Sequence, residues 1–153
     1  MLIKCITIDD EPLALKQISA FVEKTPYLEM VASCKSAFEA MDVLANNDVD
    51  LMFVDIQMPD LTGIDFVKSL NKSQKVIFTT AYQDYALEGF KVDALDYILK
   101  PFGYDEFLKA ANKAKEYFNL LNKASVKVEE KDDYLFVKSE YKIRRINLSD
   151  IVY

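Results

Sequence analysis

The sequence contains no histidine, which excludes any mechanism in which this chain itself supplies an imidazole. It has only two cysteines, Cys5 and Cys34. They are too few for a disulfide scaffold, so we interpret both as buried free thiols. No apolar run is long enough to cross a bilayer, and the first residues lack the charged and apolar zones of a signal peptide. We therefore expect a cytoplasmic protein that does not associate with a membrane.

Positive charge is also scarce, because 19 Lys and Arg residues are outnumbered by 25 Asp and Glu residues, which gives a net charge of −6. This acidic balance argues against binding of nucleic acid by charge alone. Of the 153 residues, 51% are hydrophobic and only three are glycine, a composition that indicates a soluble globular protein. The length is sufficient for one well-buried domain and a fragment, but short for two full domains.

Short apolar segments alternate with longer amphipathic ones along most of the chain. The short segments predict five β-strands, at residues 2–8, 28–33, 51–54, 76–80 and 94–99. The amphipathic segments predict helices at residues 12–24, 37–46, 63–70, 84–90 and 104–122. Five successive strand–helix units predict an α/β fold, a doubly wound five-stranded parallel sheet with helices on both faces.

The last thirty or so residues have a different pattern from the rest. Residues 122–133, with the sequence "NKASVKVEEKDD", are charged and poorly periodic, and we interpret them as a linker. Residues 134–153 have the pattern of a β-hairpin followed by a further strand that starts at Ile151. One hairpin cannot bury a core of its own. We therefore expect residues 1–121 to form one domain, and residues 134–153 to be the truncated start of a second.

Polar side chains lie at the carboxyl ends of four of the predicted strands. Asp9 and Asp10 follow the first strand, and Asp55 follows the third. Thr80 ends the fourth strand, and Lys100 follows the fifth. Open parallel sheets bind their ligands at this edge. We therefore expect three carboxylates, a hydroxyl and an ammonium to converge there from distant parts of the sequence.

The charges of such a cluster do not balance. Two carboxylates about 4 Å apart repel each other by roughly 4 kcal/mol at an effective dielectric constant of about 20. Three acids beside one lysine are therefore unstable unless protons or a cation compensate. Oxygen ligands with room for water suit Mg²⁺. Asp55 could then act as the nucleophile towards a phosphoryl group, with Lys100 and the Thr80 hydroxyl each pairing with one phosphoryl oxygen.

Four motifs at these strand ends resemble those of the receiver domain of two-component response regulators. They are "IDDEP" after the first strand, "DIQMPDLTG" around Asp55, "TTAY" at residues 79–82 and "LKPF" at residues 99–102. Each motif is weak alone, but in this order they are highly specific, and the resemblance spans about residues 2–121. It implies a flavodoxin-like strand order of 2-1-3-4-5. It also implies a phosphoacceptor switch rather than an enzyme, with at most slow self-catalysed phosphorylation and dephosphorylation.

The resemblance implies a role for each residue of the acidic cluster. Asp55 would accept a phosphoryl group from a phosphohistidine on a partner, a sensor histidine kinase. Mg²⁺ would be ligated directly by Asp10, Asp55 and the backbone carbonyl of Gln57. Asp9 would contribute to the metal site through a water molecule.

The resemblance further implies a switch pair, Thr80 and Tyr97. In such a pair the hydroxyl moves towards the phosphoryl group and the aromatic ring turns inward behind it. Without the resemblance, the sequence is equally compatible with Tyr97 as an ordinary aromatic residue of the core. A cis peptide bond between Lys100 and Pro101 is also implied.

Dimerisation and DNA binding are implied in the same way. A symmetric homodimer would form through the fourth helix, fifth strand and fifth helix, with Tyr85, Phe90 and Tyr104 as candidate contacts. The segments "FTTAYQDYALEGFKVDALDYILKPF" and "FVKSEYKIRRINLSDIVY" resemble the LytTR class of transcriptional regulators, whose second domain is a mostly β DNA-binding module. We therefore expect the intact regulator to bind promoter DNA, and the present chain not to do so.

The sequence supports three other functions less well. A haloacid-dehalogenase-like phosphatase also forms an aspartyl phosphate, but it carries a second Asp two positions after the nucleophile, where this sequence has Gln57. A flavin-binding module would need a Gly/Ser/Thr loop of backbone donors for phosphate after the first strand, and this chain has "DDEP". A receiver that only docks partners would not need the complete set of acids, threonine and lysine.

Overall fold

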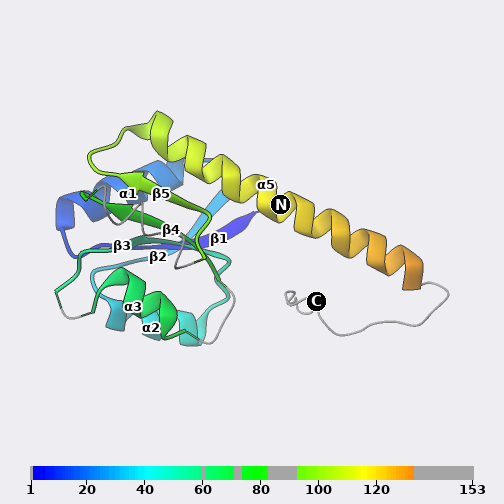
Figure 1. Ribbon diagram of the computed structural model, residues 1–153, viewed down its shortest axis with the longest axis horizontal. Helices are drawn as coiled ribbons and strands as arrows, with labels where there is room; N and C mark the ends of the chain where they lie inside the picture. The colour runs from blue at the N-terminus through cyan, green and yellow to red at the C-terminus, as the bar shows by residue number, and fades with distance from the viewer. Residues whose placement is uncertain (1, 60, 71–73, 83–92, 133–153) are drawn as a thin grey trace. The chain divides into compact units, whose positions relative to one another are not determined.

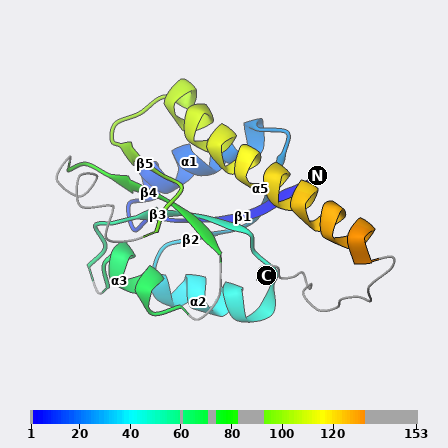
Figure 2. The same cartoon turned by 45° about the vertical axis from the view of Figure 1, so that its right-hand side comes forward.

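The computed structural model describes residues 2–59, 61–70, 74–82 and 93–132. Its contacts divide the chain into two compact units, Met1–Lys115 and Glu116–Tyr153. The first unit contains a five-stranded parallel sheet in the order β2-β1-β3-β4-β5 (Figures 1 and 2). The strands are β1 (Ile3–Ile8), β2 (Leu28–Cys34), β3 (Leu51–Asp55), β4 (Lys75–Thr80) and β5 (Asp96–Leu99). The predicted fold class and strand order are thereby confirmed.

The helices begin where the sequence provides an N-terminal signal. They are α1 (Pro12–Lys24), α2 (Ala37–Asn46), α3 (Gly63–Lys68) and α5 (Tyr104–Asp132). Pro12 opens α1, where its missing N–H costs nothing. Ser36 and Thr62 cap α2 and α3, and their hydroxyls accept the N–H groups of Glu39 and Asp65 at 3.2 and 3.1 Å.

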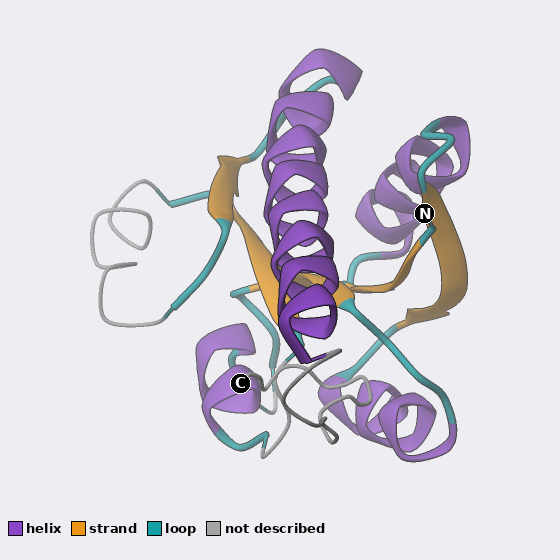
Figure 3. Ribbon diagram, turned by 90° about the vertical axis from the view of Figure 1, so that its right-hand side faces the viewer, coloured by secondary structure: helices purple, strands orange, loops and turns teal. Residues whose placement is uncertain are grey.

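Helices cover both faces of the sheet, as Figure 3 shows with the strands between two layers of helices. On one face, α2 and α3 bury Leu44 and Phe66 in a cluster with Val54 and Phe78 of the strands. On the other face, α1 and the first part of α5 pack together, and the ring of Phe107 stacks on that of Phe53 at 5.0 Å. Central strands of such a sheet are apolar on both faces, which explains the continuous apolar runs of the sequence.

The fifth helix is longer than the sequence analysis predicted, because it continues past residue 122 to Asp132. The physical reason is that neither glycine nor proline interrupts residues 104–132, and much of the charged stretch consists of good helix formers. The helix therefore covers most of the predicted linker, residues 122–133, as far as Asp132. A helical linker still connects domains, so the proposed division into domains stays a prediction.

Smaller differences affect other elements. The fifth strand begins at Asp96 rather than at residue 94, and α3 ends at Lys68 rather than at residue 70. The predicted helix at residues 84–90 and the predicted hairpin at residues 134–153 lie outside the described residues.

Cys5 and Cys34 are buried free thiols, as predicted, and burial raises their pKa values to about 12 and about 11. Among the described residues, no helix combines the length and apolar character required to span a bilayer.

Candidate acidic site

Two of the three predicted carboxylates are buried at the carboxyl end of the sheet. Asp9 follows β1 and is 3% exposed, and its Oδ1 accepts the N–H of Glu11 at 3.0 Å. Asp55 is the last residue of β3 and is 4% exposed, and its Oδ1 accepts the N–H of Gln57 at 3.3 Å. Asp10 is exposed. One carboxylate oxygen from each of the three lies within 4.8 Å of the others, so the predicted convergence is real.

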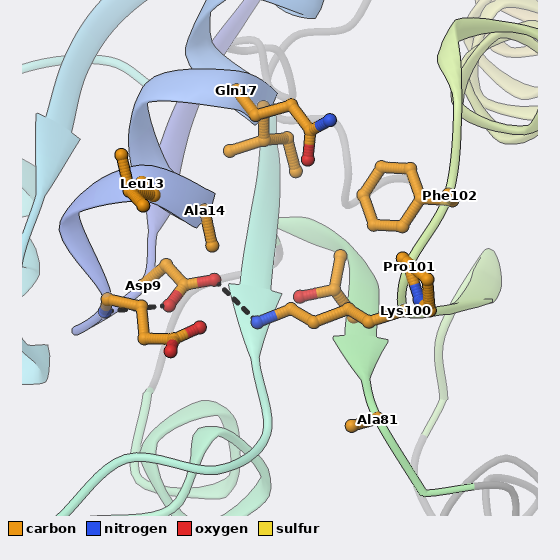
Figure 4. Close-up of a pocket in the computed structure, with 11 residues that line it drawn as sticks. Asp9, Leu13, Ala14, Gln17, Ala81, Lys100, Pro101 and Phe102 are labelled. Atoms are coloured by element: carbon orange, nitrogen blue, oxygen red, sulfur yellow. Dashed lines mark hydrogen bonds and ion pairs between the residues drawn. The ribbon is translucent and has the colours of Figure 1, made fainter.

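Lys100 reaches into this cluster from the end of β5. Its Nζ lies 2.8 Å from Asp9 Oδ2 and 3.4 Å from Asp55 Oδ1, and its side chain is only 20% exposed. Figure 4 shows the side chain extended towards Asp9. The backbone N–H of Lys100 donates to the Thr80 carbonyl at 2.7 Å, and the peptide bond to Pro101 is cis, as predicted. The lysine is therefore held at both its backbone and its ammonium group.

The electrostatics of the cluster show a shortage of positive charge. Burial and the neighbouring Asp9 raise the pKa of Asp55 from 3.8 to about 7, although Lys100 and the Gln57 N–H act in the opposite direction. Burial alone would lower the pKa of Lys100, but its bond to Asp9 and the charges of Asp55 and Asp9 leave it raised. One ammonium thus does not neutralise the acids around it. A further cation is needed for Asp55 to keep its full charge near neutral pH, since otherwise burial and Asp9 favour the protonated, neutral form.

The predicted switch residues lie on the two neighbouring strands. Thr80 is fully buried at the end of β4, and its hydroxyl accepts the N–H of Tyr82 at 3.0 Å. Tyr97 of β5 is half-buried, and its ring lies 5.2 Å from that of Phe78. Burial raises the pKa of Tyr97. These positions fit a switch pair, and the roles themselves stay predictions.

Gln57 is exposed, and the structure shows its N–H directed at Asp55. Cation binding by its carbonyl stays a prediction.

Of the three candidate dimer contacts, Tyr85 and Phe90 lie outside the described residues. The ring of Tyr104 packs against Phe21 at 5.5 Å, and its hydroxyl lies 3.0 Å from Thr25 Oγ1. These contacts within the first unit account for the packing of the Tyr104 ring and for the partner of its hydroxyl, so a dimer partner is not needed to explain either.

A cavity of about 520 Å³ adjoins the acidic site, and the sequence analysis did not predict it. It lies between the start of α1 and the segment that follows β5 (Figure 4). Leu13 is 83% exposed at its edge and lies off the buried stripe of α1. A leucine outside the apolar stripe of the helix was the sequence feature that could have indicated this cavity. The lining residues are Asp9, Glu11, Leu13, Ala14, Gln17, Ile18, Thr79, Ala81, Lys100, Pro101 and Phe102.

Comparison with known proteins gives a consistent result. The family model described as "Response regulator receiver domain" matches residues 5–112. The chain is 32% identical, over 160 aligned positions, to the "Sensory transduction protein LytT" of Bacillus anthracis, with 99% of this chain and 65% of the relative covered. It is 35% identical over 102 positions to the "Transcriptional regulatory protein BtsR" of Escherichia coli, with 65% of this chain and 43% of the relative covered. The chain therefore spans less than two thirds of these relatives' length.

A solved structure with a similar fold is the response regulatory domain of the protein mrkE from Klebsiella pneumoniae. It superimposes with a TM-score of 0.69 at 28% identity, and the match covers 77% of this chain and 99% of that one. The similarity to LytT and LytR proteins agrees with the resemblance to the LytTR class noted in the sequence. None of these matches supports the haloacid-dehalogenase-like alternative.

Proposed function

Because this chain belongs to the response regulator receiver domain family, we propose that it is a switch that is activated when Asp55 accepts a phosphoryl group. The observation that carries the proposal is the cluster itself. Three carboxylates with oxygens within 4.8 Å of one another, two of them buried, lie beside one half-buried lysine. A purely structural role would not need an unbalanced set of buried charges at a sheet edge, because such charges are costly to bury.

The donor set fits Mg²⁺. All candidate ligands are oxygens, and the chain contains no histidine. In our proposal Asp10, Asp55 and the Gln57 carbonyl would hold the ion directly, and Asp9 would act through water. When bound, Mg²⁺ would neutralise charge on the phosphoryl oxygens and on the carboxylates. Without the ion, the pKa of Asp55 is raised to about 7. A bound Mg²⁺ would lower this pKa, because a nearby cation favours the ionised, nucleophilic form of the carboxyl group.

The proposed step is a displacement at phosphorus. An Asp55 carboxylate oxygen forms a bond to the phosphorus atom, and the bond between phosphorus and the donor's leaving atom breaks. The leaving group, a histidine nitrogen or an acyl carboxylate, takes the electron pair. The Lys100 ammonium would leave Asp9 for one phosphoryl oxygen, and the Thr80 O–H would donate to another in place of the Tyr82 carbonyl, from which it lies 3.5 Å away. No residue here provides a second carboxylic acid two positions after Asp55, so turnover is expected to be slow.

The proposed phosphoryl donor is a sensor histidine kinase, which supplies the imidazole that this chain lacks. The cavity beside Asp9 and Lys100 is open to such a donor, and the exposed Leu13 gives it an apolar edge. We also propose that the chain forms a homodimer through α5, β5 and the segment between β4 and β5. The whole regulator would bind promoter DNA. The names of the LytT and BtsR relatives support a role in sensory transduction and transcription. The cytoplasmic location stays a prediction.

The direct test is incubation with Mg²⁺ and acetyl phosphate, followed by measurement of the intact mass. We expect the parent chain to gain one phosphoryl group and Asp55→Asn to gain none. Asp65→Asn is a matched control, because Asp65 is an acid in the first turn of α3, outside the cluster. Labelling that persists in Asp55→Asn would mean that the nucleophile is another residue.

A second prediction concerns the Thr80 hydroxyl. In Thr80→Val the shape is nearly kept, but the bond to the Tyr82 N–H and the proposed bond to the phosphoryl group are lost. A hydrogen bond to a charged group contributes about 1.5–3 kcal/mol, so we expect phosphorylation to slow by about ten- to a hundredfold. Mg²⁺ affinity should stay the same. Thr80→Ser keeps the hydroxyl and should behave like the parent. An unaltered rate in Thr80→Val would remove Thr80 from the mechanism.

A further inference from the structure

Gly63 allows α3 to start in direct contact with the end of β3. It is the first residue of α3 and is buried, and its N–H donates to the Ile56 carbonyl at 2.9 Å. A Cβ on Gly63 would lie 2.4 Å from the Asp55 carbonyl oxygen and 2.8 Å from Val54 Cγ1. Its φ is not positive, so the requirement for glycine here comes from space and not from backbone conformation.

The atoms that a Cβ would meet cannot easily move. Val54 and Asp55 belong to β3, which pairs with β1 on one side and β4 on the other. Asp55 lies opposite Thr79, and the next N–H, that of Ile56, donates to the Thr79 carbonyl at 3.0 Å. The Val54 side chain is fully buried in the core. The strand is therefore fixed, and the crowding must be relieved by a shift of α3 and its preceding loop or by a rotation of the Asp55 peptide.

Either movement would disturb the Asp55 carboxylate. The loop between β3 and α3 carries Gln57, whose N–H holds Asp55 Oδ1 at 3.3 Å. Rotation of the peptide after Asp55 would break the bond from the Ile56 N–H to the Thr79 carbonyl, which fixes the end of β3 that carries the Asp55 side chain. The α3 helix is itself held by Phe66, which is fully buried, so the loop cannot simply follow the added atom.

From this geometry we infer that Gly63 is a positioning residue for the Asp55 carboxylate and for the cation site next to it. The inference depends on the proposed role of Asp55 as phosphoacceptor. Gly63 touches neither ion nor phosphoryl group and acts through the backbone of Asp55. A misplacement of about 1 Å at a reacting group can cost about a hundredfold in rate.

The test is Gly63→Ala, measured first for binding of Mg²⁺ alone by calorimetric titration and then for labelling by acetyl phosphate at saturating Mg²⁺. We expect the Mg²⁺ dissociation constant to rise about tenfold and the labelling rate to fall about a hundredfold. Circular dichroism establishes that the variant is folded. If it is not, trimethylamine N-oxide, which favours the folded state, is added to all samples.

Two control variants separate positioning from stability. Gly103→Ala makes the same chemical change at a glycine where the Cβ would meet only the Asp105 side-chain oxygen, at 3.0 Å. Leu44→Ala removes buried contacts of α2 in the core, so it destabilises the fold without crowding Asp55. Both should keep the parent's Mg²⁺ affinity and labelling rate.

Each outcome has one interpretation. If the parent is not labelled on Asp55, the proposed function fails. If the parent is labelled and folded Gly63→Ala binds Mg²⁺ and is labelled like the parent, the inference about Gly63 is wrong. It is also wrong if Leu44→Ala loses Mg²⁺ affinity to the same extent, or if Gly63→Ala does not fold even with the osmolyte.

Discussion

Replacement of Lys100 by methionine is expected to change Mg²⁺ affinity and phosphorylation in opposite directions. In the structure the Lys100 ammonium lies within 3.4 Å of both buried carboxylates, so it already supplies part of the positive charge that a metal ion would bring. Without it the cluster becomes more negative. We expect Mg²⁺ to bind more tightly, on the order of tenfold, since like charges a few ångströms apart repel strongly in a buried site.

Phosphorylation of the same variant should become slower. The proposed step places negative charge on the phosphoryl oxygens next to Asp55, and Lys100 is the cation nearest to that position among the described residues. Loss of one positioned group that stabilises developing charge costs about a hundredfold or more in rate. Calorimetric titration with Mg²⁺ and intact-mass labelling with acetyl phosphate measure the two effects separately.

Lys113→Met is the matched control for this experiment. Lys113 pairs with Asp96 at 3.3 Å on the surface, so its loss changes the net charge equally without altering the acidic site. Both Mg²⁺ affinity and labelling should stay close to those of the parent. Weaker Mg²⁺ binding by Lys100→Met, or an unchanged labelling rate, would contradict the roles given to Lys100.

Most of the fold could be predicted from local patterns in the sequence. The five strands and the helices α1, α2 and α3 have the correct order and nearly the correct ends, because their ends carry local signals such as the cap Ser36 at the start of α2. The convergence of Asp9, Asp55 and Lys100 also followed from one general rule, that parallel strands present their carboxyl ends at a single edge. That rule requires only that the strands are parallel, which the alternation of strands and helices predicts. The strand order itself was implied by the resemblance to receiver domains.

Features that depend on packing at the level of side chains could not be predicted. The sequence gives Asp9 and Asp10 the same local context, yet Asp9 is buried against Lys100 and Asp10 is exposed. The sequence does not show that a Cβ on Gly63 would lie 2.4 Å from the Asp55 carbonyl oxygen, since that distance depends on how closely α3 approaches β3. The extent of α5 was missed because its charged end has no apolar period to mark it.

The free energy of unfolding of the metal-free protein should fall as the pH rises through about 7. Asp55 has a pKa of about 7 in the folded chain, raised chiefly by burial and by Asp9, against 3.8 as its ordinary value. Between these two values the folded state holds a proton that the unfolded state has released, so folding is favoured at the acidic end of the window. The slope can reach about 1.4 kcal/mol per pH unit.

The absence of histidine makes this effect measurable, because the side chain that usually titrates between pH 5 and 8 is missing from the whole chain. We expect urea unfolding in the presence of a chelator to show a loss on the order of 2 kcal/mol between about pH 5.5 and about pH 8. Asp55→Asn carries no titrating carboxyl there, so its profile should be nearly flat and its stability at pH 8 higher than the parent's. Mg²⁺ binds the ionised form and should therefore restore the parent's stability at the alkaline end. A parent profile as flat as that of Asp55→Asn would mean that Asp55 is already ionised at pH 5.5, and that Lys100 alone balances the buried acids.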